Sequence, residues 1–150
     1  MIRTILLVED NEDDVFLMQQ SIRKAQITNP LQIVEDGREV LNYLQGFGKF
    51  KDRTEFPLPF LILLDLKLPL LSGLEVLRWI RERPEFETIL VVVLTASQEE
   101  RDVDSAYRMG ANSYLVKPPS VEKLDEMTKS LGDYWLAKNV PPFQIGAVPA

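Results

Sequence analysis

The 150-residue chain contains no cysteine and no histidine. The lack of cysteine excludes disulfides and thiolate metal sites within these residues. The lack of histidine excludes Ser–His and Cys–His nucleophilic pairs, histidine-ligated metals and a phosphohistidine on this chain. Any site chemistry therefore has to come from carboxylates, hydroxyls, amides and the cationic side chains of lysine and arginine.

Long apolar runs are missing as well. A membrane-spanning helix needs roughly 18 consecutive apolar residues, and no stretch of this chain approaches that length. The N-terminal sequence MIRTILLVED reaches acidic residues too soon for a signal peptide, so we expect a cytoplasmic protein. The formal net charge of −6 repels phosphate backbones and anionic lipids, so nucleic acids and membranes are predicted to be poor partners.

Five short apolar runs alternate with amphipathic stretches along the chain. Most runs are rich in Ile, Leu and Val without polar alternation, which is typical of strands covered on both faces. They span residues 4–8, 31–34, 60–64, 89–94 and 113–116. The stretches between them have apolar residues at helical spacing, such as Val15, Met18 and Ile22. This pattern predicts an α/β fold, a doubly wound five-stranded parallel sheet with helices on both faces.

Polar residues end four of these five runs. Glu9 and Asp10 follow the first run, Asp65 the third, Thr95 the fourth and Lys117 the fifth. Because ligands bind at the carboxyl ends of parallel strands, we expect these side chains to converge there. Clustered carboxylates repel one another and call for a cation, and all-oxygen donors suit Mg²⁺. A phosphoryl group could then contact Lys117 and Thr95, with Asp65 as the nucleophile that forms an acyl phosphate.

Four motifs carry a family resemblance. They are LLVEDN at residues 6–11, LILLDLKLP at 61–69, VVVLTAS at 91–97 and NSYLVKPP at 112–119. With all four motifs present in this order, the chain resembles the receiver domain of two-component response regulators over roughly residues 3–135. The resemblance implies a flavodoxin-like fold with strand order 2-1-3-4-5. It also implies Mg²⁺ as the cofactor and a sensor histidine kinase as the phosphoryl donor.

The resemblance assigns a phosphoacceptor and a metal site. Asp65 matches the phosphoacceptor. Asp10 matches the acidic residue that binds Mg²⁺ directly, and Glu9 its neighbour that acts through water. Lys67 matches the residue whose backbone carbonyl binds the metal.

The resemblance also assigns the switch residues. Thr95 matches the switch hydroxyl, Tyr114 the switch aromatic residue and Lys117 the lysine of the site. In the family the following Lys–Pro bond is cis, which here predicts a cis bond between Lys117 and Pro118.

Each of these residues also has a purely structural interpretation. Glu9, Asp10 and Asn11 could form only a helix cap, and Asp65 or Thr95 could cap the helix that follows it. Tyr114 could be a core aromatic residue, and Lys117 a surface lysine whose stem covers apolar surface.

The chain departs from the family pattern at a few positions. Ser72-Gly73 replaces the Asp-Gly pair common in the family; Gly73 keeps the turn and Ser72 can cap the next helix. Lys67 and Ser97 stand where a side chain can affect the hydrolytic water, and hence the lifetime of an acyl phosphate.

Several functions compete on the sequence alone. The favoured one is a phosphoacceptor switch without enzyme activity, whose output is a changed protein–protein surface. A phosphohydrolase of the haloacid dehalogenase type usually has a second Asp two residues after the nucleophile, where this chain has Lys67. A flavodoxin-like FMN site would place its phosphate against the acidic sequence EDNEDD. A receiver fold that acts only as a docking module is the remaining alternative.

The C-terminal residues suggest an assembly. We expect residues 1–138 to form the receiver domain and residues 139–150, which are Pro-rich and apolar, to form an interface tail. The ending resembles that of the single-domain response regulators paired with phytochromes. This implies a homodimer and a bacteriophytochrome-type kinase as donor; alternatively, the tail is disordered or folds back on its own domain.

Overall fold

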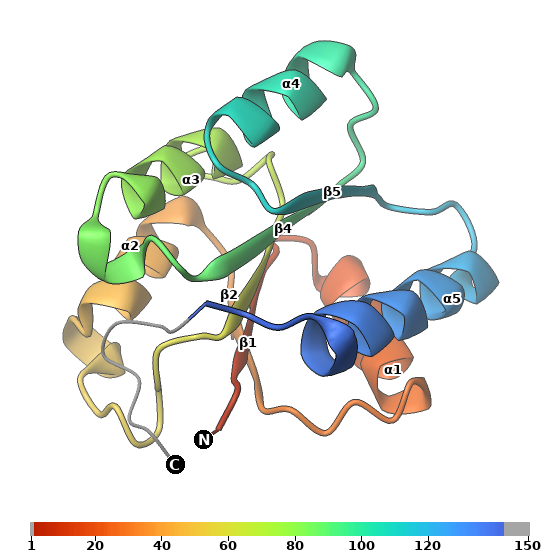
Figure 1. Cartoon of the computed structure of the whole chain (residues 1–150), viewed down its shortest axis with the longest axis horizontal. Helices are drawn as coiled ribbons and strands as arrows, with labels where there is room; N and C mark the ends of the chain where they lie inside the picture. The colour runs from red at the N-terminus through yellow and green to blue at the C-terminus, as the bar shows by residue number, and fades with distance from the viewer. Residues whose placement is uncertain (1, 143–150) are drawn as a thin grey trace.

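The computed structural model of the protein describes residues 2–142 (Figure 1). Strands and helices alternate along this part of the chain. The strands are β1 (Ile5–Val8), β2 (Leu31–Val34), β3 (Leu61–Leu64), β4 (Leu90–Thr95) and β5 (Ser113–Val116). The helices are α1 (Glu12–Lys24), α2 (Gly37–Gln45), α3 (Gly73–Arg81), α4 (Glu100–Arg108) and α5 (Val121–Leu131). Shorter segments are the 3₁₀ turns η1 (Gly48–Phe50) and η2 (Pro84–Phe86) and the π-helical segment η3 (Gly132–Lys138).

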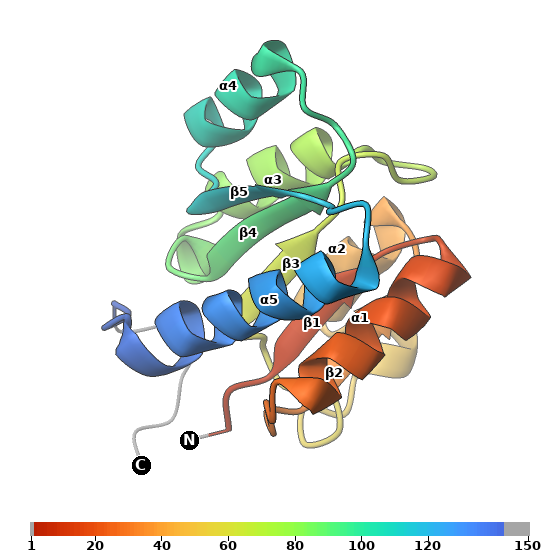
Figure 2. The same ribbon diagram turned by 90° about the vertical axis from the view of Figure 1, so that its right-hand side faces the viewer.

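The five strands pair in parallel in the order β2-β1-β3-β4-β5, which confirms the predicted fold. Helices α1 and α5 cover one face of the sheet, and α2, α3 and α4 cover the other (Figure 1). Figure 2 shows α1 and α5 lying side by side along their lengths. The strand ends that carry the polar residues therefore meet at one edge of the sheet.

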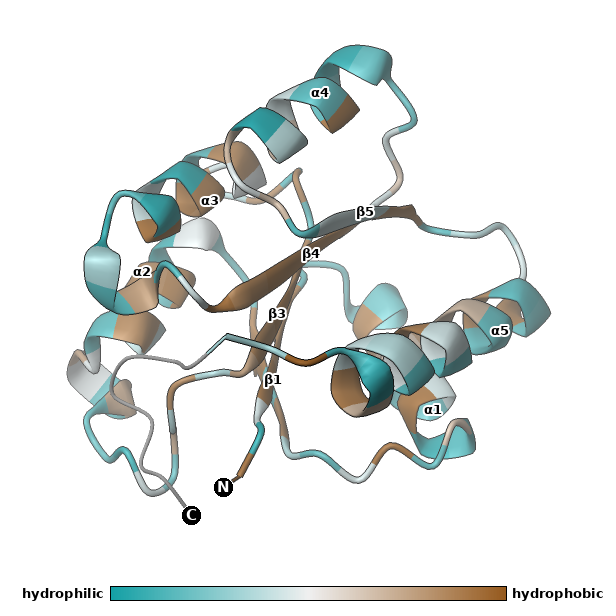
Figure 3. Cartoon of the chain, in the orientation of Figure 1, coloured by the Kyte–Doolittle hydropathy of each residue, from teal (hydrophilic) through white to brown (hydrophobic). Residues whose placement is uncertain are grey.

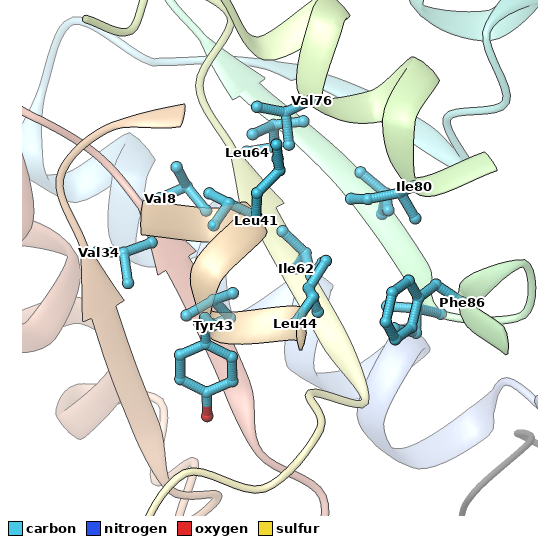
Figure 4. Packing of buried hydrophobic residues seen from close by; sticks show 14 of the residues in the cluster. Val8, Val34, Leu41, Tyr43, Leu44, Ile62, Leu64, Val76, Ile80 and Phe86 are labelled. Atoms are coloured by element: carbon cyan, nitrogen blue, oxygen red, sulfur yellow. The ribbon is translucent and has the colours of Figure 1, made fainter. Parts of the chain in front are cut away.

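The central strands bury both of their faces, as their unbroken apolar sequences predicted. Alternate residues point to opposite sides, so Ile62 and Leu64 join the cluster under α2 and α3 while Leu61 and Leu63 join the cluster under α1 and α5. Figure 4 shows the first cluster, in which Leu41 and Leu44 of α2 meet the strand residues. Colouring by hydropathy places the apolar residues on the strands and the inner helix faces (Figure 3).

Arg53 organises the long loop between α2 and β3. Its guanidinium donates to the carbonyl oxygens of Tyr43 and Leu44, at 2.8 and 2.7 Å, near the C-terminal end of α2. The buried Tyr43 hydroxyl donates to the Pro57 carbonyl at 2.8 Å, and burial raises the Tyr43 pKa to about 12. These contacts fix the path of the chain into β3, the strand that leads to Asp65.

Helix α3 begins with a capping box at Ser72. The Ser72 hydroxyl accepts a hydrogen bond from the Glu75 backbone N–H at 3.2 Å. The Glu75 carboxylate accepts one from the Ser72 backbone N–H at 2.8 Å. Ser72 therefore replaces the aspartate of the family pattern as a helix cap, as the sequence predicted.

Ser72→Ala is expected to lower the free energy of unfolding by about 1 kcal/mol, because a backbone N–H of α3 loses its acceptor. Urea denaturation followed by circular dichroism measures the change. Ser72→Thr keeps the hydroxyl and serves as the control. An equal loss in both variants would show that the hydroxyl is not responsible.

The apolar residues at the end of the last helix and just after it differ in exposure. Trp135 and Leu136 pack against the core beneath α1 and α5, whereas Tyr134 is 52% exposed and Val140 is 90% exposed. Residues 143–150, most of the predicted interface tail, lie outside the described residues. The domain boundary at residue 138 and the homodimer stay predictions. Among residues 2–142, no helix is both long and apolar enough to cross a membrane.

Candidate functional site

Asp65 is the centre of the site that the strand ends form. It directly follows β3 and is only 7% exposed. Oδ1 of Asp65 accepts from the Thr95 hydroxyl at 2.9 Å and from the Lys67 backbone N–H at 3.2 Å. Oδ2 of Asp65 accepts from Lys117 Nζ at 3.0 Å. Because α3 is capped by Ser72 instead, the interpretation of Asp65 as a helix cap is wrong.

Lys117 lies in the middle of several carboxylates. Its ammonium group donates to Glu9, to Asp14 Oδ2 at 3.0 Å and to Asp65 Oδ2 at 3.0 Å, and its side chain is 19% exposed. Burial by itself lowers the pKa of Lys117, but the hydrogen bonds to the three carboxylates outweigh this effect and hold the pKa above its ordinary value. Lys117 therefore stays protonated inside the site and is not a surface lysine.

The acidic residues after β1 complete the cluster. One carboxylate oxygen each from Glu9, Asp10 and Asp65 lies within 4.8 Å of the others. Glu9 is buried, and burial raises its pKa to about 7 with a further increase from Asp65. Asp10 is exposed, so the cluster opens to solvent on that side. Oxygen ligands that leave room for water suit Mg²⁺, and this donor set therefore fits a divalent cation.

Asn11 is the residue of this acidic stretch that caps a helix. Its Oδ1 atom accepts the Asp14 backbone N–H at 3.0 Å at the start of α1. The helix-cap interpretation therefore holds for Asn11, whereas Glu9 contacts Lys117 and the Asn11 backbone N–H. The two interpretations of this stretch are compatible.

Thr95 and Tyr114 are connected through the loop after β4. Thr95 is the last residue of β4, and α4 has Glu99 at its cap position, so Thr95 does not cap α4. The Tyr114 hydroxyl donates to the Ser97 carbonyl at 3.0 Å, and burial raises the pKa of Tyr114. The Tyr114 ring also packs against the small cluster of Leu66, Val93 and Ala106. Tyr114 thus has the core contacts of one interpretation, and its role as the switch residue stays a prediction.

Ser97 joins that loop to α4. Its hydroxyl donates to Asp102 Oδ2 at 2.5 Å and accepts the Glu99 backbone N–H at 3.3 Å. Ser97 therefore contacts its own loop, the first turn of α4 and, through its carbonyl oxygen, Tyr114 on β5.

One prediction from the resemblance is wrong in this structure. The described residues contain no cis peptide bond, so the Lys117–Pro118 bond is trans. The trans form is the lower in energy for X–Pro bonds by about 0.5–1 kcal/mol. The Lys117 backbone N–H donates to the Thr95 carbonyl at 2.8 Å, and the flexible side chain brings the ammonium to Asp65 from that position.

Asp14 was not among the predicted site residues, whereas Lys67 was predicted there both for its backbone carbonyl and for its side chain. The Lys67 side chain is exposed, and its backbone N–H contacts Asp65. Asp14 stands in the acidic run with Glu12 and Asp13, where acids are expected simply because they are favourable in the first turn of a helix. The sequence offers no signal that distinguishes Asp14 from its two neighbours.

The parallel sheet, with acids, a hydroxyl and a lysine at its carboxyl edge, defines a flavodoxin-like protein with an acidic site around one buried aspartate. Residues 5–129 match the family described as "Response regulator receiver domain". The chain belongs to this family, as the four motifs predicted.

Three relatives are similar to this chain over most of its length. The response regulator Rcp1 of Synechocystis sp. is 39% identical over 134 residues, which cover 89% of each protein. The crystal structure of its Mn²⁺-bound form has a TM-score of 0.85 at 38% identity and covers 94% of this chain and 99% of that one. The crystal structure of the phosphorylated cyanobacterial phytochrome response regulator RcpA has a TM-score of 0.87 at 34% identity. The match covers 95% of this chain and 100% of RcpA. The structure of the bacteriophytochrome response regulator RtBRR has a TM-score of 0.76 at 42% identity. The match covers 95% of this chain and 85% of RtBRR.

Proposed function

We propose that this chain is a phosphoacceptor switch in which Asp65 accepts a phosphoryl group from a sensor histidine kinase. The observation that carries the proposal is the setting of the Asp65 carboxylate. It is buried, one oxygen faces the Thr95 hydroxyl at 2.9 Å, and the other faces the Lys117 ammonium at 3.0 Å. Both groups can donate to oxygens of an incoming phosphoryl group, which is what phosphoryl transfer requires of a protein.

The transfer is an in-line displacement. A carboxylate oxygen of Asp65 forms a bond to phosphorus while the bond from phosphorus to the donor's imidazole nitrogen breaks. The electron pair of the broken bond stays on that nitrogen. Lys117 donates to one phosphoryl oxygen and Thr95 to another, so that the charge on the equatorial oxygens is stabilised during transfer.

The metal site would use the residues that cluster beside Asp65. The carboxylates of Glu9, Asp10 and Asp65 and the backbone carbonyl of Lys67 would hold Mg²⁺. When bound, the ion would neutralise carboxylate charge and allow an anionic phosphoryl group to approach. Lys117 alone supplies one positive charge against several carboxylates, which supports a requirement for a further cation.

The switch would start at Thr95. Its hydroxyl now donates to Asp65, and after phosphorylation it would donate to a phosphoryl oxygen instead. The backbone from Thr95 to Ser97 would shift together with the Thr95 side chain. The Ser97 carbonyl oxygen, which accepts the hydrogen bond from the Tyr114 hydroxyl, would therefore move as well. Phosphorylation would thus bias a two-state equilibrium that changes the surface of α4 and β5.

The relatives indicate the class of kinase. RcpA is a phytochrome response regulator and RtBRR a bacteriophytochrome response regulator, both similar to this chain over 95% of its length. We therefore propose a phytochrome-type histidine kinase as the donor.

Incubation with acetyl phosphate and Mg²⁺ is expected to add one phosphoryl group per chain, and a chelator is expected to prevent it. Intact-mass spectrometry measures both results. The matched control is the same incubation in buffer without any divalent cation. A chain that gains no phosphoryl group under any of these conditions would be a docking module. Repeated turnover of a phosphate ester would instead indicate a phosphohydrolase.

We also propose that the chain forms a homodimer through the end of its last helix and the tail. The exposed side chains of Tyr134 and Val140 support this surface. Truncation after Lys138 is expected to convert a dimer into a monomer in size-exclusion chromatography with light scattering. An unchanged mass would remove the tail from the interface.

A further inference from the structure

The ammonium group of Lys117 has a third partner that the family pattern does not assign. An ammonium carries three N–H donors. Each contacts a different carboxylate in this structure, from Glu9, Asp14 and Asp65. Glu9 and Asp65 follow strands of the sheet, whereas Asp14 belongs to α1. Lys117 is therefore held from the helix layer as well as from the sheet.

The position of Asp14 is itself well defined. Its backbone N–H is fixed by the side chain of Asn11 at 3.0 Å in the first turn of α1. Farther along, α1 is attached to α5 by the Ser21 hydroxyl, which donates to Asp125 at 2.5 Å. Lys24 donates to the same carboxylate at 3.1 Å. Because α5 follows Lys117 closely in the chain, these contacts keep Asp14 in a constant position relative to the lysine.

We infer that Asp14 is a positioning residue for phosphoryl transfer, and the inference rests on the proposed function. Glu9 and Asp14 occupy two N–H donors of Lys117 and direct the third toward Asp65. A phosphoryl oxygen on Asp65 can then take over that third donor without any reorientation of the ammonium. Preorganised donors of this kind lower the barrier because little has to be rearranged during the reaction.

A general electrostatic role does not account for this contact. Acids in the first turn stabilise a helix through its dipole, and Glu12 and Asp13 serve that purpose equally well. Within the described residues, the exposed Asp13 carboxylate makes no ion pair or hydrogen bond, whereas the Asp14 side chain, 40% exposed, reaches Lys117 at 3.0 Å. Asp13 therefore provides a control of equal charge on the same turn.

Asp14→Ala is expected to slow phosphorylation by acetyl phosphate and Mg²⁺ about fivefold, the size of effect that a partly exposed ion pair supports. Asp14→Asn keeps an oxygen acceptor and is expected to lie between this variant and the wild type. Asp13→Ala removes the same charge and is expected to leave the rate within about twofold of the wild type. Intact-mass time courses on the full chain give all of these rates.

A second measurement follows the lysine directly. The ¹⁵N resonance of the Lys117 ammonium, assigned by its loss in Lys117→Ala, is expected to be observable in the wild type because its protons are hydrogen-bonded and exchange slowly. It is expected to broaden beyond detection in Asp14→Ala and to persist in Asp13→Ala. A merely structural role for Asp14 would leave this resonance in place.

The outcomes separate the inference from the proposed function. If the wild type gains no phosphoryl group, the proposed function fails, whatever the resonance shows. If the wild type reacts but Asp14→Ala matches Asp13→Ala in rate and resonance, the inference fails and the function stands. A faster reaction in Asp14→Ala would overturn the inference as well, because Asp14 would then compete for the lysine rather than position it.

Discussion

Asp65→Asn is expected to abolish the gain of a phosphoryl group from acetyl phosphate, with a loss of roughly three orders of magnitude or more. The amide has nearly the shape of the carboxylate, so the hydrogen bond from Thr95 to Oδ1 can persist. The amide lacks the anionic oxygen that attacks phosphorus. Intact-mass spectrometry of the variant after prolonged incubation with donor and Mg²⁺ measures the result.

The matched control is Asp104→Asn, which removes one carboxylate from an exposed ion pair with Arg108 on α4. This control is expected to gain one phosphoryl group as the wild type does. Loss of the carboxylate at position 65 also relieves repulsion with Glu9 and Asp10, so the variant is expected to be at least as stable to urea as the wild type. A phosphoryl group on Asp65→Asn would place the acceptor on another residue.

Gly73→Ala is expected to reduce the free energy of unfolding by about 2–3 kcal/mol, as overpacked buried positions do. A Cβ atom at Gly73 would lie 2.2 Å from the Asp65 carbonyl oxygen and 2.6 Å from Leu66 Cα. Both are backbone atoms, and the Gly73 N–H already donates to the Leu66 carbonyl at 2.8 Å, so neither side can move without cost. Urea denaturation measures the loss, and a slower phosphorylation rate would accompany it because Asp65 has to shift.

Gly48→Ala separates this clash from the general effect of removing a glycine. No atom would lie within 4 Å of the new Cβ atom at Gly48, but its φ of +59° is unfavourable for alanine. Its expected cost is about 1 kcal/mol, from the backbone alone. Equal losses in the two variants would show that the contact with the Asp65 backbone is not the main cause.

The sheet and the convergence of the site were predictable because both follow from short-range patterns. Buried parallel strands need apolar residues on both faces, and such runs appear in the sequence. The topology then brings the residues after β1, β3, β4 and β5 to one edge. The predicted strand limits agree with the observed ones to within a residue, since the polar residues that follow the runs mark their ends.

The remaining features depend on contacts that no pattern along the chain encodes. Three consecutive acids open α1, and only the rotation of that helix decides that Asp14 faces Lys117. The trans Lys117–Pro118 bond reflects a small energy difference that the sequence cannot resolve. Tyr134 and Trp135 are adjacent in η3, yet the first is exposed and the second packs against the core.

The contacts of Ser97 have a consequence for how sequence changes can alter the response of this protein. The connection to Tyr114 uses the Ser97 backbone carbonyl, an atom that every amino acid supplies. The connection to α4 uses the hydroxyl, which few amino acids supply. A single replacement of Ser97, in evolution or by protein engineering, can therefore remove the hydrogen bond to Asp102 on α4 and keep the hydrogen bond to Tyr114 on β5.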